Sequence, residues 1–350
     1  MSARPEVLVA MSGGVDSSVA AAVLLAEGYR VTGVTMKLWG GESDTGCCSV
    51  SDVDDARRVA QQLGIDHHVF NFGEAFDAHV VQPYVADHAA GRTPNPCIEC
   101  NRHIKFDRLL QRARQLGIEL IATGHHARVV TRADGTRRLA RGADLAKDQS
   151  YVLHMLGQEQ LAQVLMPVGS MTKAAVRSHA RQLRLRTATK PDSQDVCFIA
   201  STVGRERFLR RRVELTPGRV VDTAGRCLGT VPAVELVTIG QRKHLGLGGG
   251  THDPRFAVGV DTRTATVTVG TRDDLLTATV RLDPVTWAAG PAPAGAVQAQ
   301  VSAHGDARPG FFADDLLTWA QPQRRVAPGQ SVVLYDGDEV LGGGLATHES

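Results

Sequence analysis

Apolar residues in the first two hundred positions alternate between short continuous runs and helical spacing. Strands are predicted at 7–10, 30–37, 67–71 and 118–123. Apolar positions three and four apart predict helices that begin at Val15 and that cover 53–63. This alternation predicts an α/β fold with a doubly wound parallel sheet, in which ligands bind at the carboxyl ends of the strands.

The pattern changes after about residue 212, where short β-prone runs are separated by Pro and Gly turns. These runs lie at 219–221, 257–260, 265–269 and 331–335, and no long helical period accompanies them. We therefore predict three domains: the parallel-sheet domain at 1–212, a small β-rich central domain at 213–275 and a C-terminal β-barrel at 276–350. Within the first domain, Asp134 and Gly135 between β-prone segments predict a hairpin at 129–140.

The turn between the first strand and the first helix consists of small and acidic residues. Ser12 to Ser18 has the sequence SGGVDSS. Glycines there can direct backbone amides at an anion, hydroxyl groups add donors, and the helix dipole favours negative charge. A Walker A loop would need Lys followed by Ser or Thr where Val15 and Asp16 stand. The turn therefore predicts a phosphate site of a different class.

Composition indicates a globular chain with room for several cores. The chain has 350 residues, of which 43% are hydrophobic. No apolar stretch approaches the roughly 18 residues of a membrane span, and the N-terminus lacks the pattern of a secretory signal. We therefore expect a cytoplasmic protein with no membrane partner.

Basic residues are concentrated in the middle of the chain. Positions 102–212 carry 22 Lys or Arg against 9 Asp or Glu, whereas the parts before and after are net acidic. An excess of this size favours binding of a polyanion over a merely solvated surface.

The six cysteines are Cys47, Cys48, Cys97, Cys100, Cys197 and Cys227. Without a secretory signal, metal binding, redox chemistry or ordinary burial is expected, not structural disulfides. A proline-stiffened loop delivers Cys97 and Cys100 immediately before a basic helical run at 102–114, which favours a thiolate and makes Cys100 a candidate nucleophile. No second cysteine pair completes a zinc site. Cys197 alone would be typical of a core residue, but it lies in a loop beside two carboxylates.

The SGGVDSS turn resembles the signature of the PP-loop ATP pyrophosphatases, which adenylate a substrate and release pyrophosphate. Further matching segments extend over nearly the whole chain: 36–39, 46–49, 93–106, 122–128, 148–151, 192–199, 240–242, 328–330 and 341–344. Through them the chain resembles the tRNA-specific 2-thiouridylases, which replace the C2 oxygen of the wobble uridine with sulfur. The two cysteine loops at this separation, together with the DQSY segment at 148–151, are specific to that family.

The resemblance implies an ATP site, with Mg²⁺ screening the phosphates. The implied ATP-binding residues are Ala10, Met11, Ser12, Gly13, Gly14, Val15, Asp16, Ser17, Met36 and Gly124. The implied catalytic residues are Cys197, which receives sulfur as a persulfide, and Cys100, which assists release and leaves a Cys100–Cys197 disulfide to be reduced. The implied contacts with tRNA are Asn95, Pro96, Cys97, His125, Lys147, Asp148, Gln149 and Gln330. Expected partners are tRNAs with Lys, Glu and Gln type anticodons and a sulfur-donor protein.

Two departures from the family pattern matter. Cys97 stands where many members have an Asp proposed to move protons, so that role has no support here. Cys97, Cys100 and Cys197 together offer an alternative to the persulfide, because three cysteines can ligate a [4Fe-4S] cluster with one open iron. In addition, 300–304 lacks the Arg and aromatic residue that relatives often carry, so the contact between the barrel and tRNA is expected to be weaker or differently placed.

Two other functions remain as alternatives. A small-molecule adenylating amide ligase would use the ATP site, but it would leave the cysteine loops and the basic middle unexplained. An RNA-binding protein with nucleotide as an effector would bind ATP without cleaving it between the α and β phosphates.

Overall fold

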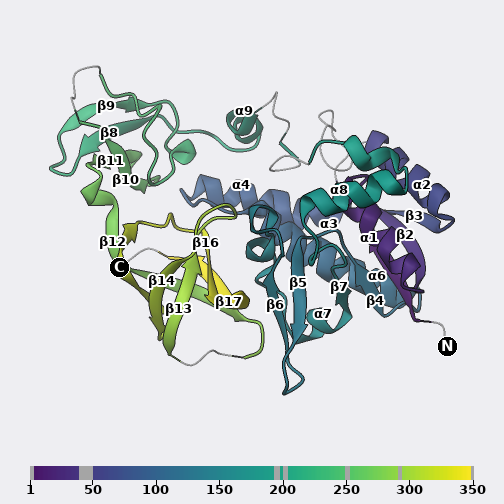
Figure 1. Ribbon diagram of the computed structural model, residues 1–350. Helices are drawn as coiled ribbons and strands as arrows, with labels where there is room; N and C mark the ends of the chain where they lie inside the picture. Colours follow the sequence, from purple (N-terminus) through teal and green to yellow (C-terminus); the bar gives the residue numbers. More distant parts are fainter. Residues whose placement is uncertain are drawn as a thin grey trace.

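The computed structural model describes residues 4–38, 50–192, 198–199, 204–248, 253–290 and 294–347. In its first part, five parallel strands form a sheet in the order β3-β2-β1-β4-β7 (Figure 1). These strands are β1 (Glu6–Ala10), β2 (Arg30–Lys37), β3 (Asp66–Asn71), β4 (Leu120–Ala122) and β7 (Val164–Leu165). The predicted strands and the order of elements are confirmed, with the strand predicted at 118–123 shorter than expected.

The central strand β1 is apolar on both faces because helices cover both. Val7 and Val9 pack in a core with α1 (Val15–Ala26), α2 (Val50–Leu63) and α8 (Lys173–Gln182). Leu8 and Ala10 pack on the opposite side with α6 (Leu109–Gln115). A continuous apolar run is the pattern expected for a strand buried in this way.

The cysteine loop is more helical than the sequence predicted. One continuous helical segment comprises α5 (Pro96–Glu99), the π-helix η2 (Cys100–Arg108) and α6. Asn95 caps it, since its side chain accepts a hydrogen bond from the amide of Cys97, and proline suits the first turn. Cys97 and Cys100 therefore lie inside the first turns of the helix, and the prediction that the helix follows them was wrong.

Shorter helices lie between and after the strands of the first part. Before the cysteines, α3 (Gly73–Phe76), η1 (Asp77–Val81) and α4 (Gln82–Ala89) follow β3. After β4 come η3 (Leu145–Lys147), η4 (Ser150–Leu153), α7 (Gln158–Gln163), η5 (Arg186–Thr189) and α9 (Gly204–Arg210).

The central part forms a four-stranded sheet in the order β10-β11-β8-β9. Its strands are β8 (Gly218–Asp222), β9 (Cys227–Val231), β10 (Phe256–Asp261) and β11 (Thr266–Gly270), with the short helices η6 (Val234–Leu236) and η7 (Asp273–Leu275). Parallel pairing between β11 and β8 joins the two hairpins, and Val220, Val267 and Val269 are buried in its core.

The C-terminal part is a closed antiparallel barrel of six strands. They are β12 (Leu276–Trp287), β13 (Gly295–Gln300), β14 (Arg308–Ala313), β15 (Leu316–Arg324), β16 (Ser331–Asp336) and β17 (Glu339–Ala346). Closure follows from the long strand β12, which pairs with β15 along its first half and with β17 along its second. The predicted fold class, including the barrel, is confirmed.

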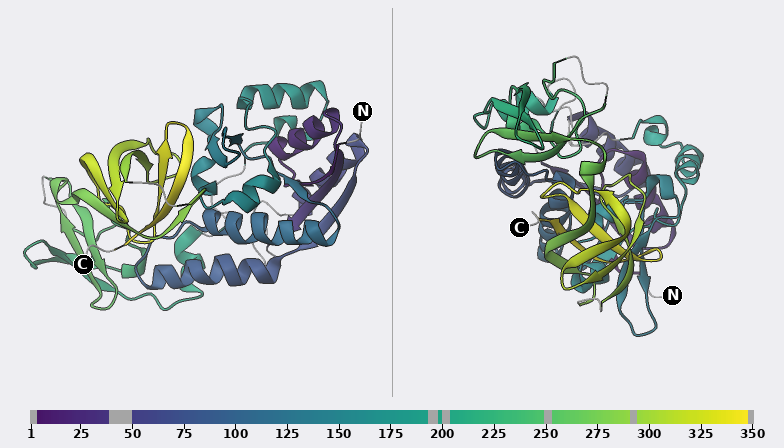
Figure 2. Two further views of the ribbon diagram at one scale, coloured as in Figure 1. Left: turned by 90° about the horizontal axis from the view of Figure 1, so that it is seen from below. Right: turned by 90° about the vertical axis from the view of Figure 1, so that its left-hand side faces the viewer.

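The predicted hairpin consists of β5 (Ala127–Thr131) and β6 (Arg137–Arg141), and it joins the barrel. Ala140 of β6 pairs with Glu339 of β17, so one sheet crosses from the first part to the barrel. Figure 2 shows the hairpin protruding beside the barrel. Apart from this shared sheet, the strands of each part fall within the domain ranges predicted from the sequence, and those ranges remain our proposal for the boundaries.

Two tyrosines fasten the barrel to the first part. The hydroxyl of Tyr151 donates to the carbonyl of Ser331 at 2.8 Å, and the hydroxyls of Ser150 and Tyr335 lie 3.1 Å apart. The guanidinium of Arg141 stacks 3.9 Å from the centroid of the Tyr335 ring. Burial raises the pKa of Tyr335 to about 12, so its phenol stays protonated and available for hydrogen bonding.

In the described part of the chain, every helix falls short of the length and apolar character needed to cross a membrane.

The Tyr151 contact gives a stability prediction. Tyr151→Phe removes the donor to the buried Ser331 carbonyl, and we expect a loss of about 1–2 kcal/mol of unfolding free energy, measured by denaturant unfolding. Tyr29→Phe is the control, because the Tyr29 ring packs beside Arg4 and its hydroxyl has no hydrogen bond among the described residues. Equal stability of the two variants would contradict the proposed fastening.

Candidate active site

The turn between β1 and α1 is braced by its own serine side chains. The Ser17 hydroxyl accepts from the amide of Ser12 and donates to the carbonyl of Gly14, both at 3.2 Å. Ser18 donates to the same carbonyl at 2.8 Å. Gly13 has a φ of 71°, and a Cβ there would collide with the carbonyl of Asp52. Glycine is therefore required at this position both for its backbone conformation and for its close contact with α2.

Backbone amides of this turn are left available. Among the described residues, no acceptor receives the amides of Gly13 or Gly14, although the neighbouring amides of Met11 and Ser12 are both bonded. Unpaired amides beside a helix N-terminus are the donors that a phosphate group needs. The predicted anion site is thus supported by the geometry of the turn.

Gly124 lies against the start of α1. A Cβ on Gly124 would stand 2.5 Å from the amide nitrogen of Ser17 and 2.7 Å from the carbonyl carbon of Asp16. Both atoms belong to the backbone and cannot move without shifting the helix. The resemblance predicted Gly124 as an ATP contact, and the structure brings it beside the turn that carries most of the other predicted ATP residues. Of the rest, Ala10 ends β1, and Met36 lies on the neighbouring strand β2.

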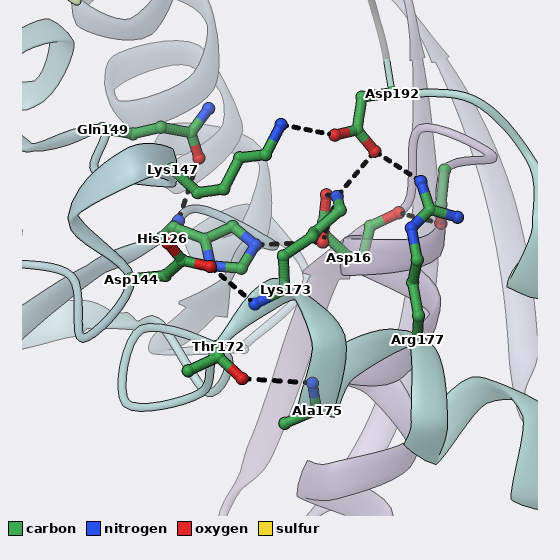
Figure 3. A network of polar contacts seen from close by, with 12 residues as sticks. Asp16, His126, Asp144, Lys147, Gln149, Thr172, Lys173, Ala175, Arg177 and Asp192 are labelled. Atoms are coloured by element: carbon green, nitrogen blue, oxygen red, sulfur yellow. Dashed lines mark hydrogen bonds and ion pairs between the residues drawn. The ribbon is translucent and has the colours of Figure 1, made fainter.

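The carboxylate of Asp16, in the first turn of α1, is held by two basic side chains (Figure 3). Nε2 of His126 lies 3.0 Å from one oxygen, and Nζ of Lys173 lies 2.7–2.8 Å from both. Burial alone would raise the pKa of Asp16, but the hydrogen bonds from His126 and Lys173 outweigh it and lower the pKa below its ordinary value. Asp16 is therefore an ionised group beside the unpaired amides.

Asp192 is the second carboxylate of this network. Three cations converge on it: Lys147 at 2.8 Å, Lys173 at 2.8 Å and Arg177 at 2.7 Å. Burial raises the pKa of Asp192, but the hydrogen bonds from Lys147 and Lys173 dominate and hold the pKa far below its ordinary value. Lys173 therefore bridges Asp16 and Asp192, as Figure 3 shows.

Another ion-pair group fixes α2 to the segment before Asp192. Lys190 contacts Asp52 at 2.6 Å and Asp55 at 2.7 Å, and Arg186 contacts Asp55 at 2.9 Å. The sequence did not reveal Lys173, Lys190 and His126, because each pairs with an acidic residue more than 100 positions away in the chain. The acidic cluster at 52–55 was the one local signal for a cationic partner.

Cys100 is buried in an aromatic cluster at the carboxyl end of the sheet. Its neighbours in this cluster include Leu38, which directly follows β2, and the rings of Phe76, Tyr84 and Phe198. The Phe198 ring packs 5.4–5.6 Å from those of Tyr84 and Phe76. Cys197 itself lies outside the described residues, as do Cys47 and Cys48. Its chain neighbour Phe198 nevertheless shares a core with Cys100.

The residues predicted to contact tRNA differ in how accessible their side chains are. His125 is buried, hydrogen-bonded to Thr123, and its pKa is lowered well below the ordinary value, chiefly by burial. The side chain of Asp148 is buried, and its carboxylate accepts hydrogen bonds from the guanidinium of Arg141 and from the amides of Gly142 and Ser150. Gln149 accepts from the amide of His126, and Gln330 accepts from that of Ala327. Lys147 is half exposed, although it pairs with Asp192.

Much of the basic excess in the middle of the chain is compensated internally. At least eleven of its 22 Lys and Arg side chains pair with acidic residues in the described part. Several partners come from the acidic flanks: Asp16, Asp52, Asp55, Glu99 and Asp338. The net charge available to a polyanion is therefore smaller than the sequence count suggested.

Within the described ranges, no group of three or more His, Cys, Asp or Glu is arranged to hold a metal ion. The cluster ligands considered from the sequence include Cys197, which lies outside those ranges. A hollow of about 470 Å³ on the outer face of η2 and α6, lined by His79, His103 and Arg114 among others, contains none of the predicted site residues.

The close packing at Gly124 gives a prediction for this site. Gly124→Ala should push the first turn of α1 out of position, lowering stability by about 1–3 kcal/mol and weakening ATP binding, measured by unfolding and by calorimetric titration. The control is Gly259→Ala on β10, where a Cβ would make only an ordinary 3.5 Å contact with Thr268. If Gly124→Ala binds ATP as the native chain does, the turn is not the ATP site.

The depressed pKa values of Asp16 and Asp192 predict an acid-sensitive fold. A carboxyl group with a lowered folded-state pKa stabilises the protein above its ordinary pKa, and this stabilisation is lost as the pH falls through the folded-state value. The melting temperature should therefore begin to drop below about pH 4 and keep dropping below pH 3, and the drop should be smaller in Asp192→Asn. Asp66→Asn, an exposed carboxylate on β3, should retain the native drop. Identical pH profiles for native and Asp192→Asn would disprove the prediction.

Family comparisons cover nearly the whole chain. Residues 5–201 match the family model described as "tRNA methyl transferase HUP domain", residues 206–271 match "tRNA methyl transferase PRC-barrel domain", and residues 278–346 match "Aminomethyltransferase beta-barrel domain".

Relatives align with this chain over nearly their whole length. The chain is 45% identical over 97% of its length to a protein of Carboxydothermus hydrogenoformans named "tRNA-specific 2-thiouridylase MnmA", of which 97% is covered. It is 44% identical to the protein of the same name from Geotalea uraniireducens, over 99% of this chain and 96% of that one. A solved structure, "Crystal structure of a 4-thiouridine synthetase - RNA complex with bound ATP", is similar at a TM-score of 0.38 and 19% identity over 55% of this chain and 45% of that chain. With full-length relatives at this level of identity, the chain belongs to the tRNA-specific 2-thiouridylase family.

Proposed function

We propose that the chain replaces the C2 oxygen of the wobble uridine, position 34 of tRNA, with sulfur. ATP is consumed, and the products are 2-thiouridine, AMP and pyrophosphate. Full-length relatives named as 2-thiouridylases support this reaction, together with the anion site at β1–α1 and the buried thiol of Cys100. Methyl transfer, which the family-model descriptions suggest, would leave both features without a role.

In the first step, the anion site binds the phosphates of ATP. The amides of Gly13 and Gly14 and the N-terminus of α1 receive the phosphate oxygens. The C2 oxygen of uridine attacks the α-phosphorus, pyrophosphate leaves, and the uridine carries an adenylate at that oxygen. Mg²⁺ would bind here mainly through the phosphates of ATP. The protein offers it the single carboxylate of Asp16, which is already paired with Lys173 and His126, and the described residues hold no group of three or more metal ligands.

The packing of Cys100 with Phe198 carries the sulfur-transfer part of the proposal. Phe198, which follows Cys197 in the sequence, belongs to the cluster that contains Cys100. Leu38 belongs to the same cluster and directly follows β2, next to β1 in the sheet. The thiol of Cys100 is therefore expected near the edge of the sheet where ATP would bind, and we propose that Cys197 acts together with it.

The sulfur atoms and electrons balance through a persulfide. A donor protein that carries a persulfide passes its outer sulfur to the thiolate of Cys197 and leaves as a thiol, since the donor's S–S bond breaks as the new one forms. The terminal sulfur of the Cys197 persulfide then attacks C2 of the adenylated uridine and expels AMP. The Cys100 thiolate then attacks the Cys197 sulfur, which breaks the S–S bond to the nucleoside and releases 2-thiouridine. The resulting Cys100–Cys197 disulfide is reduced by an external dithiol before the next turnover.

Cys97 supports a second delivery route. It is half-buried in the first turn of the helix that also contains Cys100, one turn earlier. Cys97, Cys100 and Cys197 would supply three ligands to a [4Fe-4S] cluster, and no step of the persulfide route depends on it. Many family members have an Asp at the position of Cys97, and we do not assign the proton-transfer role of that Asp to Cys97.

The tRNA part of the proposal concerns the single-stranded anticodon. The target oxygen is accessible only if the wobble base is unstacked and turned out of the loop. We retain Asn95, Pro96, Cys97, His125, Lys147, Asp148, Gln149 and Gln330 as proposed tRNA-contacting positions, with Lys, Glu and Gln tRNAs as proposed substrates. For the buried side chains of His125 and Asp148, contact would be made through the backbone or by shaping neighbouring residues.

A single-turnover assay with ATP, tRNA and a sulfur donor tests the thiol assignments. Cys197→Ser and Cys100→Ser should each lower 2-thiouridine formation by roughly a hundredfold or more, measured by chromatography of nucleosides from digested tRNA. Pyrophosphate release in the first turnover should persist, because activation precedes sulfur transfer. The matched control is Cys227→Ser, an exposed cysteine of β9 that should keep native activity.

Native thiolation by Cys197→Ser would refute the cysteine mechanism. An anaerobic preparation assayed for iron and labile sulfide separates the two delivery routes. The persulfide route predicts iron far below one equivalent per chain. About four iron atoms per chain, lost in Cys97→Ser, would instead establish the cluster route. Pyrophosphate release with ammonia and a small acid, without RNA, would favour the amide ligase.

A further inference from the structure

Lys173 lies between Asp16, next to the anion site, and a second carboxylate, that of Asp192. Its side chain is only 12% exposed, and its Nζ contacts Asp16 at 2.7 Å and Asp192 at 2.8 Å. Asp16 lies in the first turn of α1, beside the amides of Gly13 and Gly14, which have no acceptor in the described part of the chain. A polyphosphate on those amides would be repelled by Asp16 unless a cation lay between the two.

The two carboxylates are not equally able to give up Lys173. Asp192 keeps Lys147 and Arg177 if Lys173 leaves, so it remains neutralised. Asp16 would keep only the buried His126 among its described partners. Lys173 can therefore leave Asp192, whose carboxylate contacts three cations, more easily than it can leave Asp16.

We propose that Lys173 binds the β- and γ-phosphates of ATP, exchanging Asp192 for phosphate while it stays paired with Asp16. Lys173 then also holds the pyrophosphate that leaves on adenylation, which makes it a residue of the leaving-group site. This inference rests on the proposed adenylation of tRNA, and it assigns a role that no sequence motif indicated. Asp192 acts as an internal competitor of the nucleotide.

Binding measurements with three ligands test the inference. Calorimetric titration uses inorganic pyrophosphate, a non-hydrolysable ATP analogue and AMP on the full-length protein. Lys173→Met should weaken pyrophosphate and ATP-analogue binding by about ten- to a hundredfold, the range expected for one charge-assisted contact. AMP binding should stay native, because AMP lacks the terminal phosphates. Lys173→Arg should recover part of the loss.

Asp192→Asn should act in the opposite direction. Removing the competing charge should tighten pyrophosphate and ATP-analogue binding severalfold, whereas a purely structural network would weaken binding in both variants. Arg181→Ala, an exposed residue on the same helix α8, is the control and should bind like the native chain.

Two results would overturn the inference: native pyrophosphate binding by Lys173→Met, or unchanged or weaker binding by Asp192→Asn. If thermal melting shows that Lys173→Met does not fold, Asp192→Asn decides alone. Formation of 2-thiouridine by the native chain is measured in parallel. Its absence would refute the proposed function, whereas its presence with a failed binding prediction would refute only the role of Lys173.

Discussion

An ionised carboxylate next to a phosphate-binding turn is the constraint on which the site depends. Asp16 occupies the first turn of α1, where the helix dipole favours its charge but where a polyphosphate would repel it. Lys173 compensates that charge, His126 adds a hydrogen bond to the same carboxylate, and Lys173 also contacts Asp192. These partners come from three separate segments, so the turn is completed only when the whole first part has folded.

The sheet edge brings the two halves of the proposed chemistry together. The anion site follows β1, and the cluster with Cys100 and Phe198 contains Leu38 at the end of the adjacent strand β2. Asn95 caps the helix that contains Cys100, and the barrel is fastened to the first part through Tyr151 and Tyr335. Uridine activation and sulfur delivery can therefore share one edge.

Sequence patterns predicted what depends on local spacing and missed what depends on distant charges. Buried strands, the SGGVDSS turn and the hairpin around Gly135 have local signals, and they were found. The start of the cysteine helix was predicted too late: the prolines are typical of a loop, whereas Asn95 caps the helix at the amide of Cys97 and Pro96 fits its first turn. Lys173 could not be recognised, since a lysine at the start of an amphipathic helix is ordinary until folding brings it to Asp16. The positive charge that residues 102–212 present to a polyanion was overestimated for the same reason, because several of their Lys and Arg side chains pair with acidic residues of other segments.

The central claim is that ATP activates the uridine oxygen by adenylation, and the fate of that oxygen tests it most directly. A tRNA labelled with ¹⁸O at C2 of the wobble uridine would be thiolated in a single turnover, and the phosphorus products would be analysed by mass spectrometry. Attack on the α-phosphorus predicts one ¹⁸O in AMP and none in pyrophosphate. Label in inorganic phosphate, formed together with ADP, would mean activation at the terminal phosphate and would contradict the account.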